Sequence, residues 1–505
     1  MATPIEHPTR AQRETLGEEA RVRTPLAAHV GWAPRPHRSD PVALIEEQNA
    51  RRDADLVPVR HGRMMVSPFT FYRGAAKIMA DDLSGTPTAG LTVQLCGDAH
   101  LSNFGVYASP ERTMVFDIND FDETLPGPFE FDVKRLAASL TVAARHNGCT
   151  PDEARDVTVA CVRAYREAMR HFAQLGTLDI WYAHLTEDDL REMMRRAITE
   201  PAAGNGKKGV GKKDKKGAKG EGEDVPVAAV GAMSAKDAKK LEKRFEKNAE
   251  KARSRTSMQA LAKLTEVVDG RHRIVSVPPV IVPGRELDAT YGIDPALMED
   301  VILSQFKSYR SSLQHDRRHL LEQFEVVDWA RKVVGVGSVG TRAFIALLQG
   351  VDETDPLFLQ VKEATTSVLE GPLRKSRFAQ PGQRVVHGQR LMQGTSDIFL
   401  GWTRGQEEGR FFYWRQLRDM KGSALVDQMS TRTLEFYGRL CGWTLARAHA
   451  RSGDPIAIAA YLGADDTFEL AITDFSQRYA DQNERDHAAF LEAVRTSRIE
   501  AVEGV

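Results

Sequence analysis

The pattern of apolar and polar residues divides the chain into short strands and long amphipathic helices. Residues 91–96 and 357–364 are short, largely apolar runs, which is typical of buried strands. Apolar residues recur at helical spacing over residues 132–145, 152–175 and 431–450, and these segments are predicted to be amphipathic helices. Both patterns together predict an α+β fold.

Two segments lack this patterning. Residues 1–60 are rich in Pro, Arg, Glu and His, so we expect a partly ordered lead-in. Residues 204–220 contain seven lysines and one aspartate, which predicts a flexible insertion ahead of an exposed charged helix at 236–253. The run from Gly206 to Lys213 falls short of a P-loop, because its last position should be Ser or Thr.

Composition narrows the class of protein. With 505 residues the chain can bury one large bilobal core or two to three domains. The 69 basic and 70 acidic residues give a net charge of −1, so we predict no nucleic-acid partner. Four scattered cysteines indicate a reducing interior. Because the sequence has no apolar signal region and no run of apolar residues of membrane-spanning length, we expect a cytoplasmic protein without a membrane partner.

Residues 97–103, Gly-Asp-Ala-His-Leu-Ser-Asn, carry the most informative chemistry. Asp98 can accept a proton from an attacking hydroxyl, and His100 is expected to hold the loop by hydrogen bonds. The amide oxygen of Asn103 can hold Mg²⁺ against phosphates together with a second carboxylate. This spacing of residue types is what phosphoryl transfer from a nucleotide requires.

The second carboxylate follows the apolar run 114–116. Spacing from Asn103 favours Asp117, whereas the local sequence Asp120-Phe121-Asp122 resembles a metal loop equally well. A run of carboxylates is costly to pack without a cation. We therefore expect Asp117 and Asp120 to be metal ligands along with Asn103.

A second block, at residues 333–342, is an apolar strand with a glycine-rich bend, followed some twenty positions later by a lysine at the end of a buried strand. Glycines would let the backbone approach phosphates, and the ammonium would neutralise them. Glu370 is expected to pair with this lysine, because the nearer Glu363 alternates onto the opposite face of the strand. The predicted nucleotide-binding residues are Gly335, Gly337, Ser338, Gly340, Lys362 and Glu370.

Residues 97–117 resemble the catalytic and metal loops of the aminoglycoside phosphotransferase and choline kinase branch of the protein-kinase-like superfamily. Runs at 67–74, 96–105, 116–123 and 389–393 resemble the uncharacterised bacterial family of domain of unknown function 2252, over most of the chain from about residue 60 to 490. That family supplies no established reaction. The wider resemblance implies a bilobal protein-kinase-like fold that uses ATP and Mg²⁺.

Two features depart from the kinase-like pattern. Cys96 stands where such enzymes normally have His before Gly-Asp, and the catalytic loop precedes the glycine-rich segment instead of following it. We therefore expect a circular permutation, which costs little when the original termini lie close together. The expected parts are the lead-in (1–60), the catalytic half of the helical lobe (61–200), the insertion with its charged helix (201–255), a helical connection (256–332), the sheet-rich lobe (333–420) and the completion of the helical lobe (421–505).

The sequence thus predicts an ATP- and Mg²⁺-dependent phosphotransferase that acts on a hydroxyl of a small molecule or protein. One alternative is a hydrolase in which Asp98, His100, Asp117 and Asp120 bind two metals and the glycine-rich segment is only structural. Another is a nucleotide-binding pseudokinase. Lys362 separates the first two, because a hydrolase has no use for it.

Overall fold

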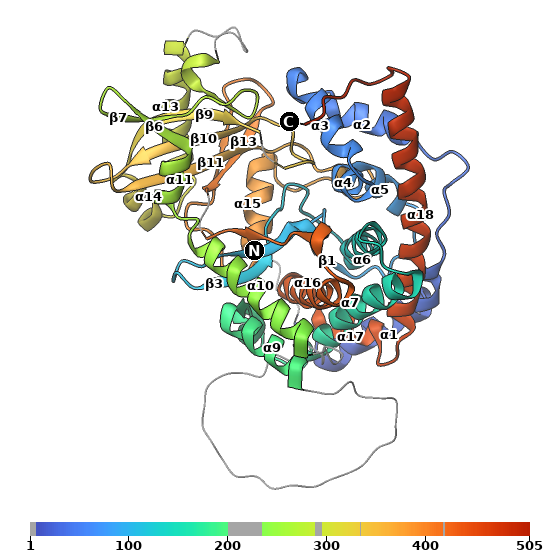
Figure 1. Ribbon diagram of the computed structural model, residues 1–505. Helices are drawn as coiled ribbons and strands as arrows, with labels where there is room; N and C mark the ends of the chain where they lie inside the picture. Colours follow the sequence, from blue (N-terminus) through green and yellow to red (C-terminus); the bar gives the residue numbers. More distant parts are fainter. Residues whose placement is uncertain (1–6, 200–234, 288–294, 334, 418–419, 505) are drawn as a thin grey trace, which may run out of the picture.

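The computed structural model describes residues 7–199, 235–287, 295–333, 335–417 and 420–504, shown in Figure 1. The chain is a mixed α+β protein with several antiparallel sheets. The lysine-rich insertion at 204–220 and its P-loop-like run lie outside the described residues. Within the described ranges, no helix is both long and apolar enough to cross a membrane.

The largest sheet has six antiparallel strands in the order β12-β13-β11-β10-β9-β8. The strands are β8 (Ile281–Pro283), β9 (Glu325–Lys332), β10 (Ala343–Gln349), β11 (Pro356–Glu363), β12 (Gly401–Arg404) and β13 (Phe411–Gln416). Residues 333–342 are predicted to form an apolar strand with a glycine-rich bend, but β9 already ends at Lys332. The glycine-rich segment is instead the connection between β9 and β10. Gly335 and Gly340 have φ of 68° and 85°, values that side chains other than glycine disfavour.

Strand alternation gives this sheet two different faces. The register pairs Lys362 with Tyr413 and Gln360 with Arg415, so these polar residues share one face. Leu359, Val361 and Trp414 belong to an apolar cluster with the helices α13 (Pro295–Ser311) and α14 (His315–Leu321), which cover the other face. The strand predicted at 357–364 is confirmed as β11. Its polar face is the one that α13 and α14 do not cover.

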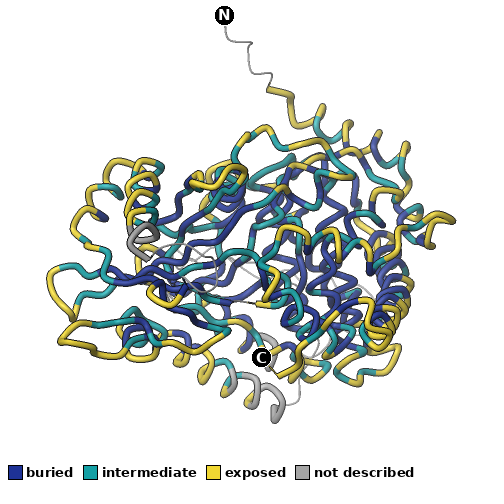
Figure 2. The backbone as a smooth tube through the Cα atoms, turned by 90° about the horizontal axis from the view of Figure 1, so that it is seen from above, coloured by how far each residue is buried: buried dark blue, intermediate teal, exposed yellow. Residues whose placement is uncertain are grey.

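The helical part of the molecule is built around α6 (Phe129–His146), α7 (Pro151–Phe172), α16 (Thr431–Ser452) and α18 (Thr467–Arg495). The helices predicted at 132–145, 152–175 and 431–450 are confirmed. α16 packs closely on α7, because a Cβ at Gly442 would lie 2.3 Å from the carbonyl oxygen of Cys161. Figure 2 shows buried residues, in dark blue, concentrated in this part and along the large sheet.

Smaller sheets connect the two parts. The predicted strand at 91–96 is β1 (Thr92–Leu95), which pairs with β4 (Leu125–Pro128). A second sheet has the order β14-β2-β3-β5, from β14 (Gly422–Ser423), β2 (Phe104–Ala108), β3 (Met114–Ile118) and β5 (Leu185–Thr186). α15 (Pro381–Met392) packs against β12 and β13 of the large sheet and also against β1 (Figure 1).

The N-terminal segment is more ordered than its sequence predicts. Residues 10–83 form α1 (Arg10–Arg23), α2 (Pro41–Asn49), α3 (Val57–Met65), α4 (Pro68–Gly74) and α5 (Ala76–Leu83). α1 packs on α17 (Pro455–Leu462) through the buried small residues Gly17 and Ala20. Contacts between small residues leave no strong hydrophobic period, which explains why the sequence pattern missed this helix.

Further elements extend the two parts. The charged helix predicted at 236–253 is confirmed as α10 (Ala235–Arg253). Other elements are α8 (Thr177–Tyr182), α9 (Glu187–Thr199), α11 (Ser257–Leu264), β6 (Thr265–Val268) and β7 (Arg271–Ile274).

Candidate active site

The loop that carries Asp98 follows β1 and is fixed by its backbone. Asp132 of α6 accepts hydrogen bonds from the backbone N–H of Cys96 at 2.7 Å and of Gly97 at 3.0 Å. Gly97 has a φ of 86°, and a Cβ there would lie 2.3 Å from the carbonyl oxygen of Glu123. The loop therefore needs glycine at this position for both conformation and space.

α16 supports the same loop from behind. Nε2 of His449 lies 3.3 Å from Asp132, and Nδ1 of His449 lies 2.9 Å from the hydroxyl of Tyr165. All three side chains are buried. An imidazole from a distant helix thus orients the carboxylate that holds the loop.

Asp98 is held in a defined orientation. Nε of Arg135 of α6 donates to Oδ1 of Asp98 at 2.9 Å, and the two side chains form an ion pair in which Nη2 lies 2.8 Å from the same oxygen. Nε2 of His100 lies 3.6 Å from Oδ2 of Asp98. Burial raises the pKa of Asp98 to about 6, although Arg135 opposes this shift. Burial also holds the pKa of His100 well below its usual value, assisted by Arg73 and Arg135, so this imidazole is neutral. The arrangement suits a proton acceptor that works near neutral pH.

Three oxygen-bearing side chains lie beside this acceptor. Asn103 donates its Nδ2 hydrogen to the carbonyl oxygen of Asp98 at 2.8 Å, which leaves its Oδ1 available as a ligand. The side chains of Asp120 and Asp122 are each 28% exposed. These oxygens fit the requirements of Mg²⁺, which prefers carboxylate and amide oxygens and keeps several waters.

Lys362 reaches this group from the polar face of the large sheet. Its Nζ lies 2.6 Å from Oδ2 of Asp122 and 3.6 Å from Oδ2 of Asp120. The hydroxyl of Tyr413 donates to Oδ1 of Asp122 at 2.6 Å. Burial alone would lower the pKa of Lys362, but Asp120 and Asp122 raise it above its usual value.

The neighbouring positive charges also determine the protonation state of Asp120. Burial would raise its pKa, but Lys362, Arg415 and Lys421 outweigh burial and hold the pKa below its usual value. Asp120 is therefore ionised at neutral pH and suited to hold a cation.

A cavity of about 500 Å³ joins these residues to the connection between β9 and β10. Backbone and side chains from α2, the loop 97–103, the glycine-rich segment and the η5 turn (Val368–Glu370) contribute to it. Of the residues predicted from sequence, the cavity is lined by Asp98, His100, Asn103, Asp120, Gly335, Gly337, Ser338 and Glu370. Its size and polar lining fit a small-molecule site.

Other predicted residues lie elsewhere. Asp117 does not line the cavity and is 1% exposed; it forms a buried ion pair with Arg447 of α16. Gly340 instead contacts the connection between α2 and α3, where its carbonyl oxygen accepts from the backbone N–H of Asp53 at 2.7 Å. The carboxylate that pairs with Lys362 is that of Asp122 and not that of Glu370. Lys362 itself is 2% exposed and lies behind the carboxylates.

Sequence reasoning overlooked several residues that shape the site. Arg135 follows Asp98 by 37 positions, so no local motif marks it. Arg384 of α15 donates to the carbonyl oxygens of Asp122 at 2.8 Å and Thr124 at 2.6 Å, which fixes the carboxylate segment to this helix. Burial raises the pKa of Glu123, which also lines the cavity, to about 7. The run of acidic residues Asp120-Phe121-Asp122-Glu123 indicates that Asp122 could belong to the site, but the spacing from Asn103 does not distinguish Asp122 from its neighbours.

The fold and the cavity define an α+β protein with a carboxylate-lined site between an antiparallel sheet and a helical part. The chain matches the family model described as "Uncharacterized protein conserved in bacteria (DUF2252)" over residues 52–221 and 216–493. Because these matches cover most of the chain, the protein belongs to this family, as its motifs predict. No curated protein and no solved structure matches the chain.

Proposed function

We propose that the protein is an ATP- and Mg²⁺-dependent phosphotransferase that acts on a hydroxyl group, with a circularly permuted kinase-like fold. The observation that carries this proposal is the ion pair between Lys362 and Asp122, residues 240 positions apart. This ion pair places the lysine of β11, in the same sheet as the glycine-rich connection, next to the carboxylates that follow Asn103 in the sequence. A hydrolase would need no such lysine.

The connectivity supports the permutation. The glycine-rich segment joins β9 and β10, β11 carries Lys362, and α15 precedes β12 and β13. α16 then ends beside β1, where the backbone N–H of Gln94 donates to Oγ of Ser452 at 3.2 Å. A chain that continued from α16 into β1 would run sheet, helix and catalytic loop in the order of an ordinary kinase. The permuted order changes where the chain begins but keeps the same neighbours in space.

The residues have separate tasks in this proposal. Asp98 takes the proton of the acceptor hydroxyl, and Arg135 orients it. Bound Mg²⁺-ATP supplies the phosphoryl group, and Asn103 and Asp120 would hold the cation. Lys362 supplies positive charge next to these carboxylates, and the glycine-rich connection lets the backbone approach phosphates.

The two-metal hydrolase has less support. Its four ligands would have to converge, but Asp117 is engaged with Arg447 outside the cavity. Among the residues that the structure describes, no group of three or more His, Cys, Asp or Glu side chains is placed to hold a metal ion. A single Mg²⁺ held by an amide, a carboxylate, phosphates and water needs no such group.

Calorimetric titration with a non-hydrolysable ATP analogue and Mg²⁺ tests the proposal. We expect Lys362→Ala to bind at least tenfold more weakly than wild type, because Asp120 and Asp122 of the cavity lose the buried ammonium that pairs with them. Lys307→Ala removes an exposed lysine of α13 and should bind like wild type. Cooperative unfolding of each variant checks that it is folded.

Two results would contradict the proposal: no binding of the nucleotide to wild type, or unchanged affinity in folded Lys362→Ala. Transfer of label from γ-labelled ATP to water, to the protein or to an added alcohol then tests for activity. Nucleotide binding without any transfer would identify the pseudokinase.

A further inference from the structure

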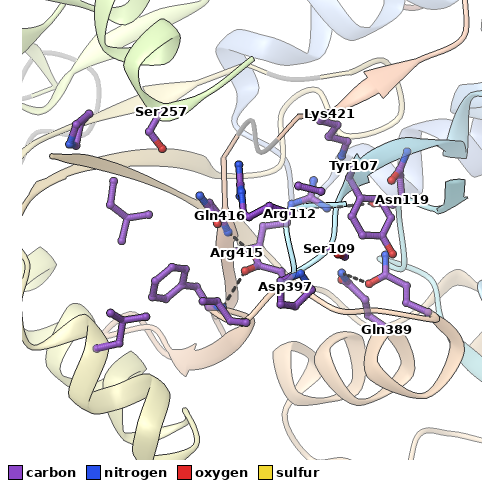
Figure 3. Close-up of a pocket in the computed structure, with 18 of the residues that line it drawn as sticks. Tyr107, Ser109, Arg112, Asn119, Ser257, Gln389, Asp397, Arg415, Gln416 and Lys421 are labelled. Carbon is purple, nitrogen blue, oxygen red and sulfur yellow. Dashed lines mark hydrogen bonds between the residues drawn. The ribbon is translucent and has the colours of Figure 1, made fainter. Parts of the chain in front are cut away.

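Two cavities outside the proposed phosphoryl-transfer site differ in the character of their walls. The cavity in Figure 3, of about 330 Å³, is bordered in part by polar side chains that bond within the protein. Arg415 donates to the side-chain oxygen of Gln360 at 2.9 Å, and the carboxylate of Asp397 accepts from the backbone N–H of Gln416 at 2.5 Å. The other cavity, of about 430 Å³, is lined mainly by apolar side chains.

This apolar cavity lies between α9, α10, the sheet of β2, β3 and β14, and the first half of α16 (Figure 1). Asp98, Asn103, Asp120, Asp122 and Lys362 do not line it. Every one of the surrounding elements contributes to its lining, and the apolar side chains include Val106, Met114, Leu190, Met194, Phe245 and Leu440. Its volume is within the range of pockets that bind small organic molecules.

The cavity lies where two apolar clusters meet. Met114 packs with Ala249 and Ala252 of α10, whereas α9 and α16 belong to the main core, and Val106 and Phe245 contact both clusters. The alanines let α10 approach β14 closely, but their methyl groups are too small to fill the space beside them. Unfilled space between apolar walls forfeits van der Waals contacts and favours an apolar guest over water.

Positive charge lies where the cavity opens to solvent. Lys247 and Lys251 are four positions apart on α10, so they share one face of the helix, and both are exposed and line the cavity. Neither forms an ion pair with a residue in the described ranges. The carboxylate of Glu187 also lines the cavity, but it is paired with Arg191 at 2.8 Å and with Arg253. The opening therefore suits an anionic group that stays in water.

We propose that this cavity binds a single-chain amphipathic anion, an alkyl chain that ends in a carboxylate. The chain lies against Val106, Leu190 and Leu440, and the carboxylate lies beside Lys247 and Lys251 at the opening. Burying the chain removes apolar surface from water, and the flexible lysine side chains can reach the carboxylate without leaving solvent. Such a site is independent of the proposed phosphoryl transfer.

Methionine side chains in the lining fit a flexible guest better than a rigid one. Met114, Met194 and Met429 come from three different elements around the cavity. A methionine is unbranched and polarisable, so it adapts to an irregular apolar surface. An alkyl chain can follow a cavity with such walls, and its affinity should rise with each methylene group that enters.

Calorimetric titrations of the full chain with hexanoate, octanoate, decanoate and dodecanoate, below the concentrations at which they form micelles, test this site. We expect one molecule bound per chain and roughly tenfold tighter binding for each added pair of methylene groups. Dodecanol lacks the charge and dodecyltrimethylammonium reverses it, so both should bind more weakly than dodecanoate. No binding of dodecanoate, no increase with chain length, or equal binding of the cation would overturn the proposal.

Charge reversal at the opening tests the position of the carboxylate. Lys247→Glu combined with Lys251→Glu should weaken dodecanoate binding about tenfold and leave dodecanol binding unchanged. The matched control combines Lys239→Glu with Lys243→Glu, which makes the same change in charge on exposed residues of the same helix outside the lining. All four residues are exposed, so both variants should fold. An equal loss of affinity in the two variants would refute the assignment.

Filling the cavity tests the position of the chain. Val106→Trp should weaken binding of dodecanoate and dodecanol alike at least tenfold, because the indole takes the space of the alkyl chain. Val351→Trp adds the same side chain at a position that is 93% exposed and should bind both probes like wild type. Unchanged affinity in folded Val106→Trp would contradict the position of the chain, and the charge-reversed variants decide the outcome if Val106→Trp does not fold.

Discussion

Replacing Asp117 by Asn should destabilise the protein without directly affecting Mg²⁺ binding. Oδ1 of Asp117 contacts Arg447 and accepts from the backbone N–H of Ile118 at 2.8 Å. Oδ2 accepts from the backbone N–H of Gly394 at 2.9 Å and lies 3.5 Å from the hydroxyl of Tyr107. The carboxylate is therefore the common acceptor for donors from β2, β3, α16 and the end of α15.

The size of the expected loss in the free energy of unfolding follows from the burial of both partners. Asp117 and Arg447 are each 1% exposed, so water cannot replace a lost partner. An asparagine keeps one acceptor oxygen and turns an NH₂ group toward the remaining donors. Removing one partner of a buried ion pair costs about 3–5 kcal/mol, and we expect Asp117→Asn to lose that much of the free energy of unfolding.

Guanidinium denaturation and Mg²⁺-dependent nucleotide titration check this prediction on the same samples. Asp120→Asn is the matched control, because its side chain is 28% exposed and lines the cavity. It should lose Mg²⁺-dependent binding and keep its stability to within about 1 kcal/mol. A stable Asp117→Asn variant that no longer binds Mg²⁺ and nucleotide would refute the reasoning and restore Asp117 as a metal ligand.

Three further outcomes are expected. Asp98→Asn should abolish transfer but keep nucleotide affinity, and the rate of wild type should fall as the pH drops through about 6, because the carboxylate must be ionised to accept a proton. A pH profile that stays flat from 5 to 8 would argue against this role. Gly97→Ala should destabilise more than Gly148→Ala in denaturation experiments, since both have positive φ but only Gly97 meets a backbone oxygen, at 2.3 Å. Gly442→Ala should lower the melting temperature, because its methyl group would press on the carbonyl of Cys161; an unchanged melting temperature would show that the two helices can separate.

The sequence by itself determined the local elements and the residues of the loop 97–103. Helical spacing located α6, α7 and α16, and short apolar runs located β1 and β11, because these signals depend only on neighbouring positions. Asp98, His100 and Asn103 lie within one loop, so their proximity was certain before the fold was known. The helix α1 escaped this reasoning, since Gly17 and Ala20 pack without a hydrophobic period.

Only the tertiary structure decided which carboxylates share the cavity. Every residue of β3 is buried, so alternation along the strand could not say which way Asp117 faces. Arg447, 330 positions away, engages Asp117, while Lys362 from the large sheet meets Asp122 across 240 positions. Charge pairing between distant segments depends on how the sheet and the helices dock, and no local pattern in the sequence encodes that docking.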